Sequence, residues 1–195
     1  MSELILVGGC PGTGKSTIGR LLAKTLGYVL VDLDSATCAM TEGLLMALGC
    51  DKNDRESEPY VQRVKPLEYE TILNIAQDNL DIGRSIICTA PFTSLFRDPQ
   101  WIDWIETSTA VRDATLSLVW LTADTTATRS RIIHRNADRD QRKLDSWEKY
   151  SANLPAEPPS DTRIMRFDNT QDNDMDSVVM RILKELEKQK NQEAV

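Results

Sequence analysis

The chain has 195 residues, of which 41% are hydrophobic and 27% charged, so it can bury one core of ordinary domain size. Its formal net charge of -7 favours a small-molecule partner over nucleic acid, which needs a basic surface, although it leaves room for a local basic patch. A single histidine gives little support for a histidine-based zinc site or a Ser-His-Asp triad.

The first quarter of the chain alternates short apolar runs with helical patterns. Residues 3–7 form an apolar run followed by glycines, which predicts a buried strand. Apolar residues then recur at helical intervals over 18–26, and Gly27 ends that helix. A second strand is predicted over 28–31, and a helix over 35–48.

The same alternation continues to the end of the sequence. The later predicted elements are a polar loop over 51–58, a helix over 69–80, a strand over 85–88, a helical turn over 101–105, a strand over 116–121, a helix over 125–133, a strand over 164–167 and an amphipathic helix over 175–186. Strands alternating with helices predict an α/β fold with a parallel sheet covered on both faces. We expect one domain over residues 1–190 and a frayed tail over 191–195.

The stretch GCPGTGKST, between the first predicted strand and helix, has the spacing of a phosphate-binding loop, Gly9-x-x-x-x-Gly14-Lys15-Ser16. Its glycines let backbone N–H groups turn toward an anion, and the positive end of the following helix points at the same anion. A glycine-rich bend without a ligand would not need the complete Gly-Lys-Ser ending. The residues expected to bind nucleotide here are Gly9, Gly12, Thr13, Gly14, Lys15, Ser16 and Thr17.

Two carboxylates, Asp32 and Asp34, follow the second predicted strand, where residues of a parallel sheet line the ligand crevice. On an extended backbone, residues two apart point to the same side. One carboxylate could hold Mg²⁺, and the other could orient an attacking hydroxyl or accept its proton. The alternative is that Asp34 or Ser35 caps the next helix, and the spacing alone leaves both roles open.

An arginine-rich segment over 129–145 stands out in an acidic chain. Its basic residues are Arg129, Arg131, Arg135, Arg139, Arg142 and Lys143. By itself this pattern favours a solvated helix with charge pairs one turn apart. Beside a phosphate loop, arginines on a closing segment would stabilise the charge of a transferred phosphoryl group, so we expect a lid here.

Together these motifs resemble the P-loop kinases of small hydroxyl substrates, namely the shikimate and gluconate kinases, and the kinase domain of polynucleotide 5′-hydroxyl kinases. The loop, Asp34, and the RN-x-x-R pattern at Arg135, Asn136 and Arg139 are closest to the last group, whereas VDLDS resembles the shikimate type. The resemblance implies a three-layer P-loop sandwich with a five-stranded parallel sheet of order 2-3-1-4-5.

The resemblance also implies roles for single residues. Those assigned to catalysis are Lys15, Asp34, Arg135 and Arg139, with Asp34 as base or orienter of the acceptor hydroxyl. Ser16 and Asp32 are assigned to Mg²⁺. Arg131 and Asn169 join the nucleotide-binding set, and Asn169 is placed in the loop that borders adenine. The implied cofactors are ATP and Mg²⁺.

The implied reaction transfers the γ-phosphoryl group of ATP to a hydroxyl group of a small molecule. The resemblance is weak over 36–66 and 92–110, which would hold the acceptor. Basic residues there that could bind an anionic acceptor, or stay surface charges, are Arg55, Arg63 and Lys65. Aromatic residues that could line the pocket, or pack in the core, are Phe92, Trp101 and Trp104.

Three alternatives accompany this interpretation. A polynucleotide 5′-hydroxyl kinase is disfavoured by the acidity and by Thr37, where those enzymes carry an arginine. An ATPase or switch module without an acceptor is disfavoured by Thr89, where a Walker B carboxylate would follow the third strand. A kinase-like toxin acting on a nucleotide sugar is not distinguished by the sequence, which carries no signal for an oligomeric state.

Hydropathy and cysteine usage predict a cytoplasmic protein. No apolar run approaches the length of a membrane span, and the amino terminus has no basic leader, so we expect neither a membrane partner nor a secretory signal. The four cysteines show no metal spacing and no disulfide pattern, and we expect reduced thiols.

Overall fold

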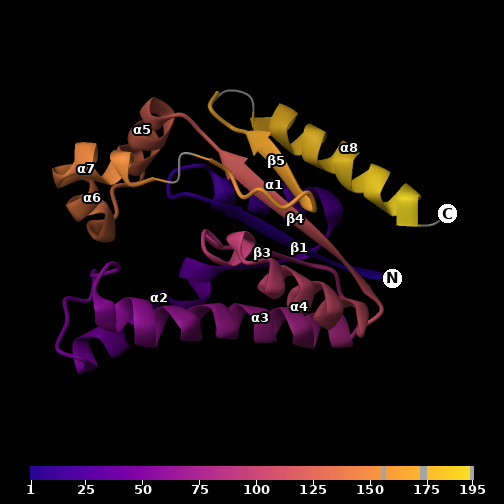
Figure 1. The fold of residues 1–195 in the computed structure, drawn as a ribbon, viewed down its shortest axis with the longest axis horizontal. Helices are drawn as coiled ribbons and strands as arrows, with labels where there is room; N and C mark the ends of the chain where they lie inside the picture. The colour runs from indigo at the N-terminus through magenta and orange to yellow at the C-terminus, as the bar shows by residue number, and fades with distance from the viewer. Residues whose placement is uncertain (155–156, 172–174, 194–195) are drawn as a thin grey trace.

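The computed structural model describes residues 1–154, 157–171 and 175–193, and within them a five-stranded sheet forms the centre of the molecule (Figure 1). The strands are β1 (Ser2–Gly9), β2 (Val29–Asp32), β3 (Ile86–Thr89), β4 (Ala114–Thr122) and β5 (Ile164–Asp168). Their order is β2-β3-β1-β4-β5, and every hydrogen-bonded neighbour pair is parallel. The predicted α/β fold and strand order are confirmed.

Helices cover both faces of this sheet. The longer helices are α1 (Lys15–Leu26), α2 (Leu33–Ala47), α3 (Lys65–Asp81), α4 (Pro99–Ala110), α5 (Thr125–Arg135) and α8 (Met175–Glu193). Shorter helical segments are η1 (Tyr60–Val64), η2 (Leu95–Arg97), η3 (Asp138–Asp140), α6 (Gln141–Asp145) and α7 (Trp147–Ala152). Figure 1 shows α3 and α4 on one side of the sheet and α1 and α8 on the other.

The alternation of side chains along β1 explains the three layers. Leu4 and Leu6 pack in a core shared with α3 and α4, whereas Ile5 and Val7 pack in a second core shared with α1 and α8. A strand that is apolar on both faces must be covered on both faces, as its continuous apolar run predicts. The loop that follows β1 therefore emerges between two helical layers.

The junction of β2 and α2 differs from the prediction. Strand β2 ends at Asp32, and α2 begins at Leu33, two residues earlier than expected. Asp32 is the N-cap, because its Oδ1 accepts a hydrogen bond from the backbone N–H of Ser35 at 3.1 Å. Neither Asp34 nor Ser35 caps the helix, so Asp34 lies in its first turn rather than on an extended strand.

Other helix boundaries in the structure also differ from the predicted ones. The expected helical turn at 101–105 is part of the longer helix α4, which Asp98 caps. Helix α8 continues to Glu193, beyond the expected end of the ordered chain at residue 190. The last two residues of the expected tail lie outside the described residues, as do 155–156 of the proline-rich connector. Within the described part of the chain, no helix combines the length and the hydropathy needed to cross a membrane.

Candidate active site

The glycine-rich loop lies between β1 and α1, and its backbone conformation depends on glycine. Gly14, which immediately precedes α1, has φ of 92°, in the left-handed region that residues with a Cβ rarely adopt. A Cβ built at Gly14 would stand 2.4 Å from Nδ2 of Asn169. The loop and the segment after β5 therefore touch at a point where no side chain fits.

Asn169 and Arg131 stabilise this loop by hydrogen bonds to its backbone carbonyl groups. The Asn169 side chain is 1% exposed, and its Nδ2 donates to the Thr13 carbonyl at 2.8 Å. Arg131 donates to the Asn169 carbonyl at 2.7 Å and to the Gly12 carbonyl at 3.4 Å. The resemblance placed Asn169 beside adenine, but in the structure its amide supports the loop. Asn169 also lines a hollow together with its exposed neighbours Asp168 and Gln171 and with Arg181.

Replacing Asn169 by alanine is expected to lower the free energy of unfolding by about 1–3 kcal/mol, because the buried Thr13 carbonyl loses its donor. Nucleotide affinity should fall in parallel, since the loop loses its brace. Thermal unfolding and calorimetric titration with ATP measure both effects. The control is Gln171→Ala on the exposed side of the same segment, which should change neither. An Asn169→Ala protein with normal stability and affinity would contradict the bracing role.

Lys15 reaches back over the loop, with its Nζ donating to the Cys10 carbonyl at 2.8 Å. The pKa of Lys15 is lowered to about 8, chiefly by burial. The nearby Arg135 contributes to the lowering, whereas Cys10, Asp34 and Asp32 partly oppose it. The free protein therefore holds this ammonium charge at neutral pH but loses it in mildly alkaline solution. A nucleotide phosphate would supply the counter-charge that the site lacks.

ATP affinity is expected to be constant below about pH 8 and to weaken above it, by up to about tenfold per pH unit. The sign follows from the lowered pKa: above it, Lys15 is neutral in the free protein and must take up a proton to bind the phosphates. Titration calorimetry from pH 6.5 to 9.5, in two buffers of different ionisation enthalpy, measures both the affinity and the proton uptake. A flat profile without proton uptake would show that Lys15 does not contact the nucleotide.

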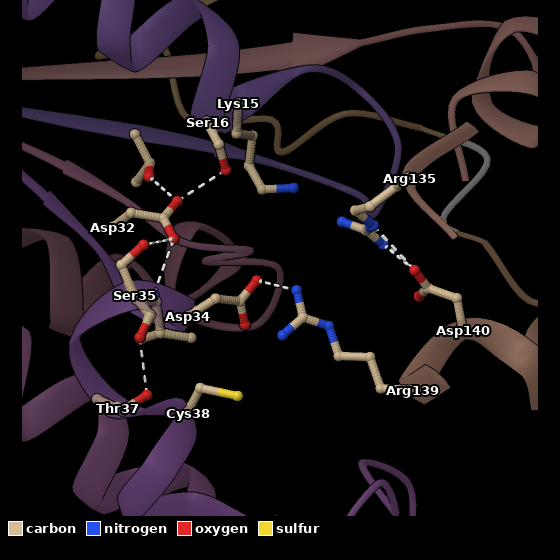
Figure 2. Close-up of polar contacts among 12 residues, drawn as sticks. Lys15, Ser16, Asp32, Asp34, Ser35, Thr37, Cys38, Arg135, Arg139 and Asp140 are labelled. Atoms are coloured by element: carbon tan, nitrogen blue, oxygen red, sulfur yellow. Dashed lines mark hydrogen bonds and ion pairs between the residues drawn. The ribbon is translucent and has the colours of Figure 1, made fainter. Parts of the chain in front are cut away.

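Asp32, at the end of β2, accepts hydrogen bonds from one hydroxyl group of α1 and one of β3. Its Oδ2 accepts from Ser16 Oγ at 2.7 Å and from Thr89 Oγ1 at 2.6 Å (Figure 2). Burial raises the pKa of Asp32, but the hydrogen bonds from Thr89, Ser16 and Ser35 outweigh it and hold the pKa below its usual value. Thr89, interpreted from the sequence as a missing carboxylate, thus orients Asp32 toward Ser16 from the adjacent strand.

This arrangement fits Mg²⁺. Ser16 and Asp32 offer hard oxygen ligands within hydrogen-bond distance of one another, and Asp32 is ionised at neutral pH. Among the described residues, no group of three or more His, Cys, Asp or Glu side chains could hold a metal. Two protein oxygens are what Mg²⁺ needs when substrate phosphates and water fill its other positions.

Asp34 faces the arginine-rich segment. Its Oδ2 accepts from Arg139 Nη2 at 2.7 Å, and its side chain is 49% exposed, against 19% for Arg139. Arg135 instead pairs with the fully buried Asp140, through Nε at 2.9 Å and Nη2 at 2.6 Å. Figure 2 shows Lys15, Asp34, Arg135 and Arg139 arranged around one space.

Two cavities meet at this space. One, of about 540 Å³, lies along the loop and is lined by Gly12, Gly14 and Arg131. The other, of about 220 Å³, is lined by Asp32, Asp34 and Arg139. Three residues line both cavities: Lys15, Ser16 and Arg135. The geometry therefore suits two ligands that meet end to end at the amino terminus of α1.

The predicted site residues divide into two groups. Those that line one or both cavities are Gly12, Gly14, Lys15, Ser16, Thr17, Asp32, Asp34, Arg131, Arg135 and Arg139. Those that support the loop are Gly9, whose N–H donates to the Pro91 carbonyl at 3.0 Å, and the buried Thr13 and Asn169.

Sequence reasoning missed two tyrosines of the smaller cavity. Tyr60 and Tyr69 line it together with Arg55 and Lys65, whereas the third basic candidate, Arg63, does not. The helical periodicity assigned Tyr69 to a core face, and no motif marks Tyr60. Phe92 is fully buried, so its role is core packing.

Comparisons with known proteins agree with this geometry. Shikimate kinase from Chlorobium phaeobacteroides is 38% identical over 81 residues, which are 42% of this chain and 40% of that protein. Shikimate kinase 2 from Photorhabdus laumondii is 25% identical over 113 residues, 57% of this chain and 61% of that protein. The chain thus spans less than two thirds of the length of these relatives.

Solved structures share the fold over nearly the whole chain. A sugar kinase from Janibacter superposes with a TM-score of 0.62 at 17% identity, covering 96% of this chain and 95% of that one. A gluconokinase from Sinorhizobium meliloti gives 0.54 at 17% identity, covering 96% and 97%. The predicted resemblance to shikimate and gluconate kinases is confirmed, in sequence for the former and in fold for the latter.

The family model described as an AAA domain matches residues 4–158. This range includes the glycine-rich loop, both aspartates and the whole arginine-rich segment. It covers most of the sequence, from β1 through the segment after α7. The chain therefore belongs to the AAA domain family.

Proposed function

We propose that the protein transfers the γ-phosphoryl group of ATP to a hydroxyl group of a small molecule. The observation that carries this proposal is the meeting of two cavities at Lys15, Ser16 and Arg135, with Asp34 on the far wall of the smaller one. The larger cavity follows the loop and suits a nucleotide. The smaller cavity suits an acceptor whose hydroxyl approaches the terminal phosphate. The shikimate kinase relatives support the same reaction class.

Nucleotide binding would rest on the loop and on Lys15. The backbone N–H groups that open α1 point at the phosphates, and the helix adds its positive end. Lys15 would leave the Cys10 carbonyl and contact the β- and γ-phosphates. Ser16 and Asp32 would hold Mg²⁺, which when bound neutralises charge on those phosphates.

Asp34 would orient the acceptor and take its proton. In the structure it pairs with Arg139 at 2.7 Å, so the acceptor must enter between the two side chains and replace that contact. Asp34 then accepts the hydrogen bond of the hydroxyl as the oxygen attacks the γ-phosphorus in line. Transfer of this kind consists mostly of positioning and charge stabilisation, so the enzyme forms no covalent intermediate.

The arginine-rich segment would act as a lid. Arg135, Arg139 and Lys143 line the acceptor cavity from this segment, and Arg142 lies 3.2 Å from Asp54 on the opposite rim. Closure would exclude water from the transferred phosphoryl group, which strengthens charge contacts and suppresses hydrolysis. Release of Arg139 from Asp34 would allow its guanidinium group to stabilise the negative charge of the transferred phosphoryl group.

The test is a panel of hydroxylated metabolites incubated with ATP and Mg²⁺ and screened by mass spectrometry. We expect one class of compound to gain a single phosphate, with one ADP formed per product. Lys15→Met protein, run in parallel, should give neither. If ADP forms without a phosphorylated product from any compound, the protein is a hydrolase and the proposal is wrong.

The nucleic-acid alternative gains no support from the structure. Thr37, at the position where polynucleotide kinases carry an arginine, is 2% exposed, and its hydroxyl donates to the Leu33 carbonyl at 2.7 Å. The side chain is therefore directed into the helix layer and away from the cavity. A 5′-hydroxyl oligonucleotide belongs in the panel as a compound expected to stay unmodified.

A further inference from the structure

A groove of about 770 Å³ runs between α3 and the segment formed by η2 and α4, next to the acceptor cavity. Its apolar lining consists of Val61, Pro66, Leu73, Leu95, Trp101 and Trp104. Trp104 is 49% exposed and Val61 46%. Contiguous apolar surface of this kind on a soluble domain commonly marks a binding site.

The groove adjoins the acceptor cavity. Lys65 and Tyr69 line both of them. Tyr69 is held in place, because its hydroxyl accepts from the backbone N–H of Phe92 at 3.1 Å and its ring lies 5.5 Å from the Phe92 ring. The junction is therefore a fixed wall, and a ligand could pass along it from one hollow to the other.

Lys65 places a cation at this junction. Within the described residues its ammonium group makes no hydrogen bond and no ion pair, in contrast to Arg135, Arg139 and Lys143, which all contact carboxylates. A cation that forms no ion pair with a described residue, placed between a polar cavity and an apolar groove, matches an anionic group between the polar and apolar parts of one molecule.

We propose that the groove is a subsite for an apolar tail of the acceptor. The acceptor is then an amphiphile, with its hydroxyl at Asp34, an anionic group beside Lys65 and a tail against Trp101 and Trp104. This inference rests on the proposed function of the acceptor cavity. The difference in size supports it, because a cavity of about 220 Å³ holds only a small polar head, whereas the groove is more than three times larger.

Straight-chain carboxylates from butanoate to dodecanoate test the subsite by calorimetric titration without ATP. Each methylene buried in the groove should tighten binding about fourfold, so decanoate, with four more methylenes, should bind about 250-fold more tightly than hexanoate. The gain should stop once the groove is filled. Because no nucleotide is present, this result is independent of whether the protein transfers phosphate.

Trp104→Gln is the matched variant, since Trp104 is half exposed and its loss leaves the core intact. We expect decanoate affinity to fall at least tenfold and butanoate affinity to stay unchanged. Lys65→Gln should weaken both by the same factor. The control is Val111→Gln, which changes an apolar residue that is 74% exposed and outside the groove, and it should change neither.

Three results would overturn the inference. The first is equal affinity for all chain lengths. The second is a chain-length dependence that survives Trp104→Gln. The third is a concentration-dependent dimer in sedimentation that Trp104→Gln abolishes, because the groove would then be an interface between copies of this chain.

Discussion

Replacing Asp34 by asparagine is expected to lower kcat by about 10²–10⁴-fold, the usual contribution of acid–base assistance, while ATP affinity stays within about twofold. Asparagine keeps the size of the side chain and can still accept a hydrogen bond from Arg139. It lacks the negative charge that attracts the acceptor proton. Since Asp34 is half exposed and its side chain bonds, among the described residues, to Arg139 alone, the fold should persist.

The measurement is turnover of the acceptor found in the metabolite panel, together with calorimetric titration of ATP and thermal unfolding. Asp51→Asn provides the control, because Asp51 also faces an arginine of the lid, Arg142 at 3.5 Å, but it lies on the outer rim. That variant should keep kcat within about twofold, in line with the small value of exposed ion pairs. An Asp34→Asn enzyme with near-normal kcat would remove Asp34 from the reaction.

The parts of the site that lie close together in sequence were predictable. The backbone conformation of the loop from Gly9 to Ser16 is determined by its local sequence, since glycines at fixed spacing between a strand and a helix permit one main conformation. The sheet order followed from the resemblance. The two-core arrangement followed from an apolar run on β1 whose alternate residues face opposite layers.

Contacts between distant strands were not predictable. Thr89 looked like a missing carboxylate because the motif places a metal ligand on the strand next to β1. In the structure the hydroxyl of Thr89 holds Asp32, which extends from β2 to Ser16. The same carboxylate caps α2, and this double role starts the helix two residues early. Neither the contact of Thr89 with Asp32 nor that of Asp32 with Ser16 can be inferred from spacing along the chain.

The residues that line the proposed acceptor cavity could not be predicted from the sequence for a related reason. Tyr60 and Tyr69 come from η1 and α3, and they line the same cavity as Asp34 only because α2 packs against these elements. The buried Glu68 fixes that packing, since it accepts from Tyr60 Oη at 2.9 Å and from Thr41 Oγ1 at 2.6 Å. A glutamate within a helical pattern is typical of a surface residue, so this link was not predictable.

Replacing Lys15 by methionine is expected to reduce turnover by about 10³-fold or more, the range that cations on a transferred phosphoryl group supply. Methionine keeps the apolar stem but brings no charge to the β- and γ-phosphates. The Cys10 carbonyl, which Lys15 contacts, still accepts a hydrogen bond from Thr13 Oγ1 at 2.8 Å, so no buried group is left unpaired. The pH dependence of ATP affinity above about pH 8 should disappear with the ammonium group.

The same variant should be at least as stable as the wild type near neutral pH. Burial lowers the pKa of Lys15 from 10.5 to about 8, so the unfolded chain binds this proton more tightly than the folded one. The wild type therefore gains stability as pH rises from about 8 to 10.5, and the methionine variant lacks that gain. Lys24→Met removes an equal charge from the exposed face of α1 and should leave turnover unchanged. An inactive Lys15→Met protein with a lowered Tm would assign the loss to folding, whereas an inactive protein with an unchanged or raised Tm isolates the charge as the cause.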